Sequence, residues 1–182
     1  LAVVAVVYLT LAQYVLLLND PVLIGAGFWP AAGVSLALLL LLPTRSWPWV
    51  LAGIGLGEFG GDLLHGYPLG AIGLWTIGNM AEPLVGAYLV RRFASHRGDL
   101  APARRLLAFL AFAVIAGPLV GATIGSLGTI HFVGSAADQV WPKYVVGDAL
   151  GVLVMAPALL TWSLRTPIRS RTEWATLIGV SL

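Results

Sequence analysis

The sequence predicts an all-α fold: a polytopic helical bundle in the membrane, with six full transmembrane helices and the start of a seventh. Of its 182 residues, 59% are hydrophobic and only 10% are charged, and the mean hydropathy is +0.92. A soluble domain is typically ~45–50% apolar and ~25% charged. One span of the bilayer takes ~20 predominantly apolar residues. The composition therefore excludes a soluble globule, a disordered chain, a coiled coil and a nucleic-acid-binding domain.

Aromatic–proline pairs mark where most of the expected helices enter the bilayer. Proline is accepted in the first helical turn, and tryptophan and tyrosine are enriched at the level of the headgroups. The expected spans are Leu1–Leu18, Trp29–Leu42, Trp47–His65, Tyr67–Phe93, Arg104–His131 and Trp141–Leu164, and a seventh begins near Thr172. Because the chain starts and stops inside apolar runs, we expect residues 1–182 to form a single transmembrane domain that is truncated at both ends.

The basic residues predict the orientation of the bundle. Nine of the ten lysines and arginines fall on the same side of this topology, and Lys143 is alone on the other side. The nine are Arg45, Arg91, Arg92, Arg97, Arg104, Arg105, Arg165, Arg169 and Arg171. The positive-inside rule places this side in the cytoplasm. The N-terminus is then cytoplasmic.

Two of the expected helices carry glycines four residues apart. They are Gly53, Gly57 and Gly61 in the third span and Gly117, Gly121 and Gly125 in the fifth. Small residues at this spacing form a groove in which another helix can approach closely. Two interpretations stay open, namely packing inside one bundle and a face for a homodimer. Pro118 is expected to kink the fifth span, since proline removes a backbone hydrogen bond and clashes with the preceding turn.

Four of the eight acidic residues fall inside the expected spans: Glu58, Asp62, Glu82 and Asp148. An ionisable group at the centre of a membrane helix costs ~2.5–3.5 kcal/mol even on insertion scales. The basic residues of the chain lie in loops or at helix ends, so they do not neutralise these acids. We therefore expect the four carboxyl groups to face the interior of the bundle, where water, a proton or a bound cation compensates them.

Depth along the helices brings a set of polar and aromatic residues together in the outer half of the bundle. The candidate ligand-binding residues are Glu58, Asp62, His65, Asn79, Asp148, Trp29, Trp75 and Tyr144. Carboxylates beside aromatic rings suit a small polar or cationic ligand, through charge pairing and cation–π contact.

Other interpretations of the intramembrane acids stay open. The acids could tie neighbouring helices together, and Glu58 and Asp148 could form part of a proton relay. Asp62 and His65 have a spacing that could chelate a metal, but that pair alone is a weak signal, so no metal site is predicted. The sequence contains no catalytic triad, phosphate loop or nucleotide fingerprint, so neither an enzyme nor a cofactor is expected.

Three motifs resemble those of a known bacterial family. They are Phe28-Trp29-Pro30-Ala31-Ala32-Gly33, Gly78-Asn79-Met80-Ala81-Glu82, and Trp141–Gly151 followed by Ala156-Pro157. These three motifs, in this order along the chain, resemble those of a family of bacterial membrane-associated sensor domains, the first-described MASE class. The resemblance implies a sensory input module in the bacterial inner membrane. Such modules precede diguanylate cyclases, cyclic-di-GMP phosphodiesterases or histidine kinases on the cytoplasmic side.

The resemblance implies no general ligand, so the site prediction depends on the residues alone. We expect a transmembrane sensor that binds a small ligand or a membrane protein partner in the outer half and signals to a cytoplasmic output. Two alternatives remain. Acids and glycine- or proline-broken helices are also features of small-molecule or ion carriers, and glycine faces are also features of a structural subunit in a larger membrane complex.

Overall fold

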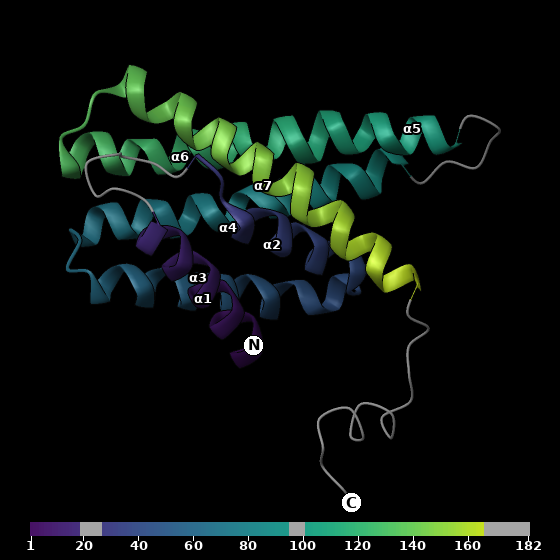
Figure 1. Cartoon of the computed structure of the whole chain (residues 1–182), viewed down its shortest axis with the longest axis horizontal. Helices are drawn as coiled ribbons and strands as arrows, with labels where there is room; N and C mark the ends of the chain where they lie inside the picture. Colours follow the sequence, from purple (N-terminus) through teal and green to yellow (C-terminus); the bar gives the residue numbers. More distant parts are fainter. Residues whose placement is uncertain (19–26, 95–100, 166–182) are drawn as a thin grey trace, which may run out of the picture.

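The computed structural model describes residues 1–18, 27–94 and 101–165, and within these ranges the chain forms six helices and no strand (Figure 1). Five of them are α1 Ala2–Leu18, α2 Pro30–Leu41, α3 Trp47–Leu64, α4 Leu69–Ala94 and α7 Ala137–Arg165. The remaining helix runs without a break through α5 Ala101–Ala108, η2 Phe109–Ala116, α6 Gly117–Gly128 and η3 Thr129–Val133. A single turn, η1 Thr44–Ser46, joins α2 to α3. The all-α prediction is confirmed for this part of the chain.

Most of the predicted helix boundaries agree with the structure, but the start of α7 does not. The helix begins at Ala137, so Trp141-Pro142 lies inside it. The preceding helix already ends at Gly134, whose φ of 83° is in the left-handed region that favours glycine. Asp138 then occupies the first turn of α7, where its carboxylate opposes the positive end of the helix dipole. The predicted helix near Thr172 falls outside the described residues.

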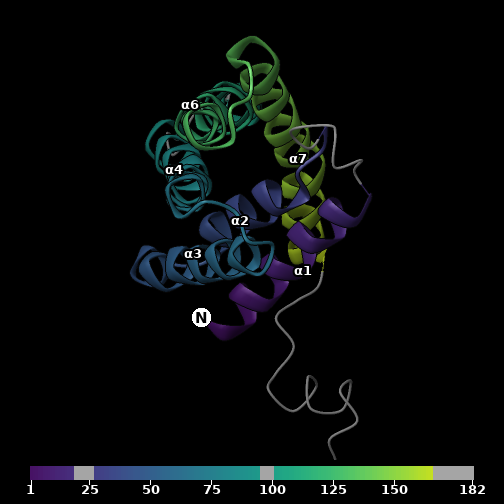
Figure 2. The same cartoon turned by 90° about the vertical axis from the view of Figure 1, so that its left-hand side faces the viewer.

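Two of the described helices are both long and apolar enough to cross a membrane, Ala103–Val133 and Ala137–Ser163. Ala2–Leu17 and Pro30–Leu41 are apolar but shorter. At ~1.5 Å per residue, α2 is about 18 Å long, against ~30 Å of bilayer hydrocarbon. Figure 2 looks along the helices and shows α2 in the middle of the bundle, between α7, α4 and α3.

The predicted glycine faces pack against helices of the same chain. In α3, Gly53 lies against Val4 and Gly57 lies against Tyr8, so α1 and α3 run in parallel. A Cβ added at Gly57 would stand 2.7 Å from the carbonyl oxygen of Ala5, which only glycine permits. Packing inside one bundle is thus confirmed for this face. A homodimer through the glycines stays a prediction.

The second glycine face joins α6 to α4. A Cβ at Gly78 would stand 2.8 Å from the carbonyl oxygen of Gly121, and a Cβ at Gly128 would meet Ala71. The residue numbers rise along one helix as they fall along the other, so the two helices are antiparallel. α1 and α3 are parallel, whereas α4 and α6, which follow one another in the chain, are antiparallel. Both orientations are those of a chain in which each helix runs opposite to the one before it. The described arginines at the ends of α2, α4 and α5 then lie at one end of the bundle.

Arg91 holds three helices together at this end. Its Nη2 donates to the carbonyl oxygens of Leu39, Leu40 and Leu42, at 2.7, 3.0 and 2.6 Å. These carbonyls belong to the last turn of α2, where the helix has no backbone donors left for them. The guanidinium also lies 5.0 Å from the ring centroid of Trp47, whose Nε1 donates to the Leu39 oxygen. From the sequence, Arg91 was expected only as one of the basic residues on the cytoplasmic side, in a loop or at a helix end.

The helix is disrupted next to Pro118, although not by a simple proline kink. The eight residues of η2 are π-helical, and the N–H of Gly117 donates to Phe112, five residues earlier. Proline has no N–H, so the carbonyl four residues before it loses its normal donor and the preceding turn is crowded. A wider turn relieves that crowding. π-helical turns are rare and often occur at functional sites.

Candidate functional site

All four acidic residues predicted to lie inside the bundle are buried there. Their exposed fractions are 6% for Glu58, 8% for Asp62, 2% for Glu82 and 5% for Asp148. They come from three helices, α3, α4 and α7. Charged side chains are almost never this buried unless they are paired, so their partners decide what the site can do.

The best-defined contact of the site joins α3 to α4. Asn79 donates from Nδ2 to Oε1 of Glu58, as their predicted similar depth suggested. Asp62 follows one turn later on α3 and interacts electrostatically with Glu58. Its Oδ2 is buried and has no hydrogen-bond partner. Two carboxyl groups therefore lie on one face of α3, and one of them is only partly satisfied.

Asp148 brings α7 into the same region. Its carboxyl group lies within electrostatic range of Glu58 and of Glu82. Glu82 packs on the glycine face of α6, where a Cβ added at Gly121 would stand 3.3 Å from its Oε2. The other oxygen, Oε1, is buried without a partner. Sequence analysis placed Glu82 inside the membrane but outside the candidate site, whereas the structure places it with the other acids.

Tyr8 is a member of this group that sequence analysis missed. It is 3% exposed, and its hydroxyl has no hydrogen-bond partner of ordinary geometry. The hydroxyl interacts with the side chains of Glu58 and Trp29 beside it, and it lies within electrostatic range of Glu82 and Asp148. The Trp29 Nε1 is also buried and unpartnered. A tyrosine in the middle of an apolar helix, too deep to anchor at an interface, was the available signal. We call Tyr8, Glu58, Asn79, Glu82 and Asp148 the acidic cluster.

A second polar network lies at the end of the bundle remote from the arginines. Trp75 donates from Nε1 to Thr129 Oγ1 at 2.9 Å, and Thr129 shares a 3.0 Å hydrogen bond with the hydroxyl of Tyr144. The Tyr67 ring meets Trp75 edge-on, with centroids 5.1 Å apart. Trp75 and Tyr144 are thus brought together as predicted, through a threonine that the sequence did not single out. The network links α4, η3 and α7.

His65 does not join the acidic cluster. Its side chain is exposed, its Nδ1 lies 2.8 Å from the carbonyl oxygen of Gly61 in its own helix, and its ring stacks on Tyr67. Its position caps the end of α3. Among the described residues, no group of three or more His, Cys, Asp or Glu is arranged to hold a metal ion. The structure therefore gives no support to chelation by Asp62 and His65.

The sequence motifs meet beside the acidic cluster. Trp29 donates from its backbone N–H to the carbonyl of Gly147 at 2.9 Å. A Cβ added at Gly151 would collide with the Trp29 carbonyl oxygen, and one added at Gly33 would collide with the oxygen of Gly151. The backbones of α2 and α7 therefore touch directly, immediately next to Asp148.

A family model for MASE1, the membrane-associated sensor 1 domain, matches residues 1–181. The chain belongs to the MASE1 family. Comparison with curated proteins and with solved structures found no match. A MASE1 domain is an integral membrane domain without catalytic activity, and it is generally an input module for signalling output domains. The resemblance that the motifs indicated is confirmed.

Like charges dominate the electrostatics of the buried acids in the part of this MASE1 domain that the structure describes. The charged groups that interact with Glu58, Glu82 and Asp148 are other carboxyl groups. Like charges in a medium of low dielectric repel strongly, and a buried charge costs several kcal/mol unless it is compensated. Protons, a cation or the polar groups of a ligand can supply that compensation.

Proposed function

We propose that this MASE1 domain is the sensory input of a bacterial inner-membrane signalling protein, and that the acidic cluster receives its ligand. The ligand is small and polar or cationic, and it enters from the outer half of the bundle. The output is cytoplasmic, a cyclic-di-GMP enzyme or a histidine kinase. The observation that supports this most directly is the buried Tyr8 hydroxyl, which lies beside Glu58 and Trp29 without a hydrogen bond of ordinary geometry to either and within electrostatic range of Glu82 and Asp148.

The chemistry of the cluster favours a cation or a donor-rich ligand. A buried polar atom without a hydrogen bond costs ~1–3 kcal/mol, so an unliganded site of this kind is destabilising. A ligand that donates to Glu82 Oε1 and to the Tyr8 hydroxyl would remove that cost. The face of the Trp29 ring would add a cation–π contact.

The arrangement of the helices offers a route from the ligand to the cytoplasmic end. Glu58, Glu82 and Asp148 lie on α3, α4 and α7, so a ligand that contacts all three draws three helices together. α7 continues from Asp148 toward the arginine end of the bundle. Displacements of ~1–2 Å between packed helices are enough to switch an attached domain. The close α2–α7 contact at Gly151 transmits such a displacement to the central helix.

The test uses the natural full-length protein in its own membrane. Glu58→Gln and Asp148→Asn should each abolish the change in output activity, with folded protein present at the wild-type level. Asp138→Asn is the matched control, because Asp138 is exposed in the first turn of the same helix as Asp148. An unchanged response in both cluster variants would reject the site. A response lost equally in the Asp138→Asn control would show that any charge change on α7 suffices.

The carrier and structural-subunit alternatives have distinct outcomes. A carrier would move a cation across liposome membranes, and Glu58→Gln would stop that flux. A structural subunit would copurify with a stoichiometric membrane partner, and the cluster variants would alter assembly without altering any ligand response.

A further inference from the structure

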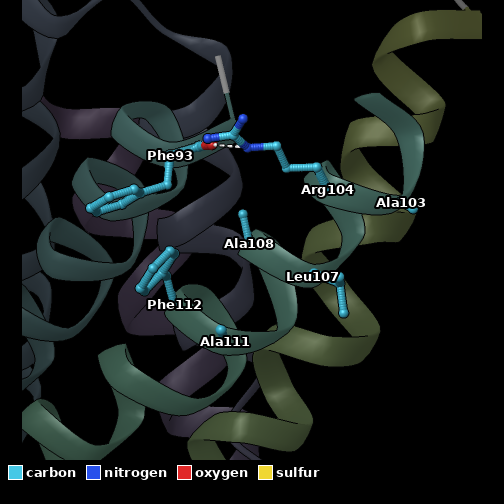
Figure 3. A pocket seen from close by; sticks show the side chains of 7 residues that line it. All are labelled: Phe93, Ala103, Arg104, Leu107, Ala108, Ala111 and Phe112. Atoms are coloured by element: carbon cyan, nitrogen blue, oxygen red, sulfur yellow. Dashed lines mark hydrogen bonds between the residues drawn. The ribbon is translucent and has the colours of Figure 1, made fainter. Parts of the chain in front are cut away.

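A groove at the arginine end of the bundle has no part in the proposed sensing site. It lies between the last turn of α4 and the start of the following helix, and its volume is about 570 Å³. The walls are apolar and include Phe93, Leu107, Ala111 and Phe112 (Figure 3). Phe93 and Phe112 stack with centroids 5.0 Å apart and form one continuous aromatic surface. Leu107 is 65% exposed, so the groove opens toward the surroundings of the bundle.

One polar side chain crosses the mouth of this groove. Arg104 reaches from α5 to α4 and donates from Nε to the carbonyl oxygen of Phe93 at 3.0 Å (Figure 3). The guanidinium of Arg92, which does not line the groove itself, lies 5.8 Å from the ring centroid of Phe93. The helix from Ala101 to Val133 contains no acidic residue. The helix that carries Arg104 therefore supplies no carboxylate to pair with the arginine at the mouth of the groove.

This combination of an apolar slot and a cationic rim has a definite position in the membrane. The arginine end of the bundle is the level at which apolar side chains give way to charge, which is where lipid headgroups lie. A phospholipid presents an acyl chain directly below a phosphate at this level. Basic pockets between helices on the cytoplasmic side bind anionic headgroups.

We propose that this groove binds an anionic phospholipid, with its phosphate at Arg104 and Arg92 and an acyl chain along Phe93, Phe112 and Leu107. Ala111 and Phe112 belong to the π-helical segment η2. The bound chain would therefore brace the widened part of the helix, independently of any ligand at the acidic cluster.

The experiment is native mass spectrometry of the natural full-length protein, released from mild detergent after incubation with phosphatidylglycerol or phosphatidylcholine. We expect selective retention of phosphatidylglycerol by the wild type. Arg104→Gln should weaken that retention roughly fivefold, as the loss of one arginine at a membrane surface predicts. Ala111→Trp should abolish it by filling the groove. Both positions are exposed, so neither change disturbs the core.

Two controls separate this groove from general effects. Arg45→Gln removes an exposed arginine at the same end of the bundle, and Leu56→Trp adds the same bulk at an exposed position of α3. Both should retain the lipid as the wild type does. Equal retention of the two lipids by the wild type would overturn the proposal. So would retention that depends on Arg104 but not on Ala111, because the headgroup alone would then be bound, outside the groove.

Discussion

The side-chain amide of Asn79 on α4 donates a hydrogen bond to the carboxyl group of Glu58 on α3. This bond fixes one acid of the cluster while Asp62, one turn away on α3, keeps an unpartnered oxygen. The same stretch of membrane helix thus holds one satisfied and one unsatisfied carboxyl group. The satisfied one ties α3 to α4, and the unsatisfied one has an oxygen that can still accept a hydrogen bond.

The Glu58–Asn79 bond should behave as a coupled pair in a double-mutant cycle. Asn79→Leu leaves Glu58 without its donor, and Glu58→Leu leaves the amide without its acceptor, so each should destabilise the protein by ~1–3 kcal/mol. The double variant replaces both polar groups and should recover much of the loss, with a coupling energy of ~0.5–3 kcal/mol. Unfolding measured in mild detergent checks this. Strictly additive losses would show that the two residues act separately.

Gly151 should tolerate no side chain. Alanine there places its Cβ on the Trp29 carbonyl oxygen, and this backbone cannot withdraw without separating α2 from α7. Overpacking of a well-packed interior typically costs ~1–3 kcal/mol. The matched control is Gly60→Ala, since Gly60 is also inside a helix but nothing stands within 4 Å of its added Cβ. That control should gain ~0.5–1 kcal/mol from the lower flexibility of the unfolded chain. Equal thermal midpoints for the two variants would contradict the direct α2–α7 contact.

The helical architecture was predictable because its signals are local. Apolar runs, the pairs Trp29-Pro30 and Trp47-Pro48, and the positions of the arginines each depend on a few neighbouring residues. The burial of all four intramembrane acids followed from the cost of exposing them to lipid. The sequence predicts how deep each acid lies along its helix but not which side of the helix it faces. Glu58 and Asn79 could be expected to lie at a similar depth for that reason.

The contacts that sequence analysis missed join residues far apart in the chain. Arg91 caps the end of α2 across 52 residues, and Thr129 joins Trp75 across 54. No local sequence feature distinguishes Arg91 from the exposed Arg92 beside it. The two differ only in the side of α4 on which they lie, and that depends on how α4 packs against α2. The aromatic–proline rule failed at Trp141 for a related reason. It describes how helices enter the bilayer, whereas α7 begins a turn earlier.

Thr129 should be the critical member of the second polar network, in which it joins Trp75 to Tyr144. Thr129→Val keeps the shape of the side chain but removes the acceptor for Trp75 and the partner of Tyr144. Two half-buried polar groups then lose a hydrogen bond, which should cost ~0.5–1.5 kcal/mol each. Thr161→Val is the control, because Thr161 is exposed and bonds only to carbonyl groups of its own helix. A loss of stability as small as that of the control would show that water replaces Thr129.

Tyr8 offers a test in which stability and function should change in opposite directions. Its hydroxyl is buried beside Glu58 and Trp29 without a hydrogen bond of ordinary geometry, so Tyr8→Phe removes a poorly satisfied polar group and should stabilise the unliganded protein by ~1 kcal/mol. The same change deletes a group that we propose to contact the ligand, so the response of the output should weaken. Residues kept for function at a cost in stability commonly show this trade-off. Tyr14→Phe, at an exposed position of the same helix, should change neither property. A Tyr8→Phe variant that is less stable than the wild type would mean that the hydroxyl is bonded in the resting protein, and the cluster would then be a structural network.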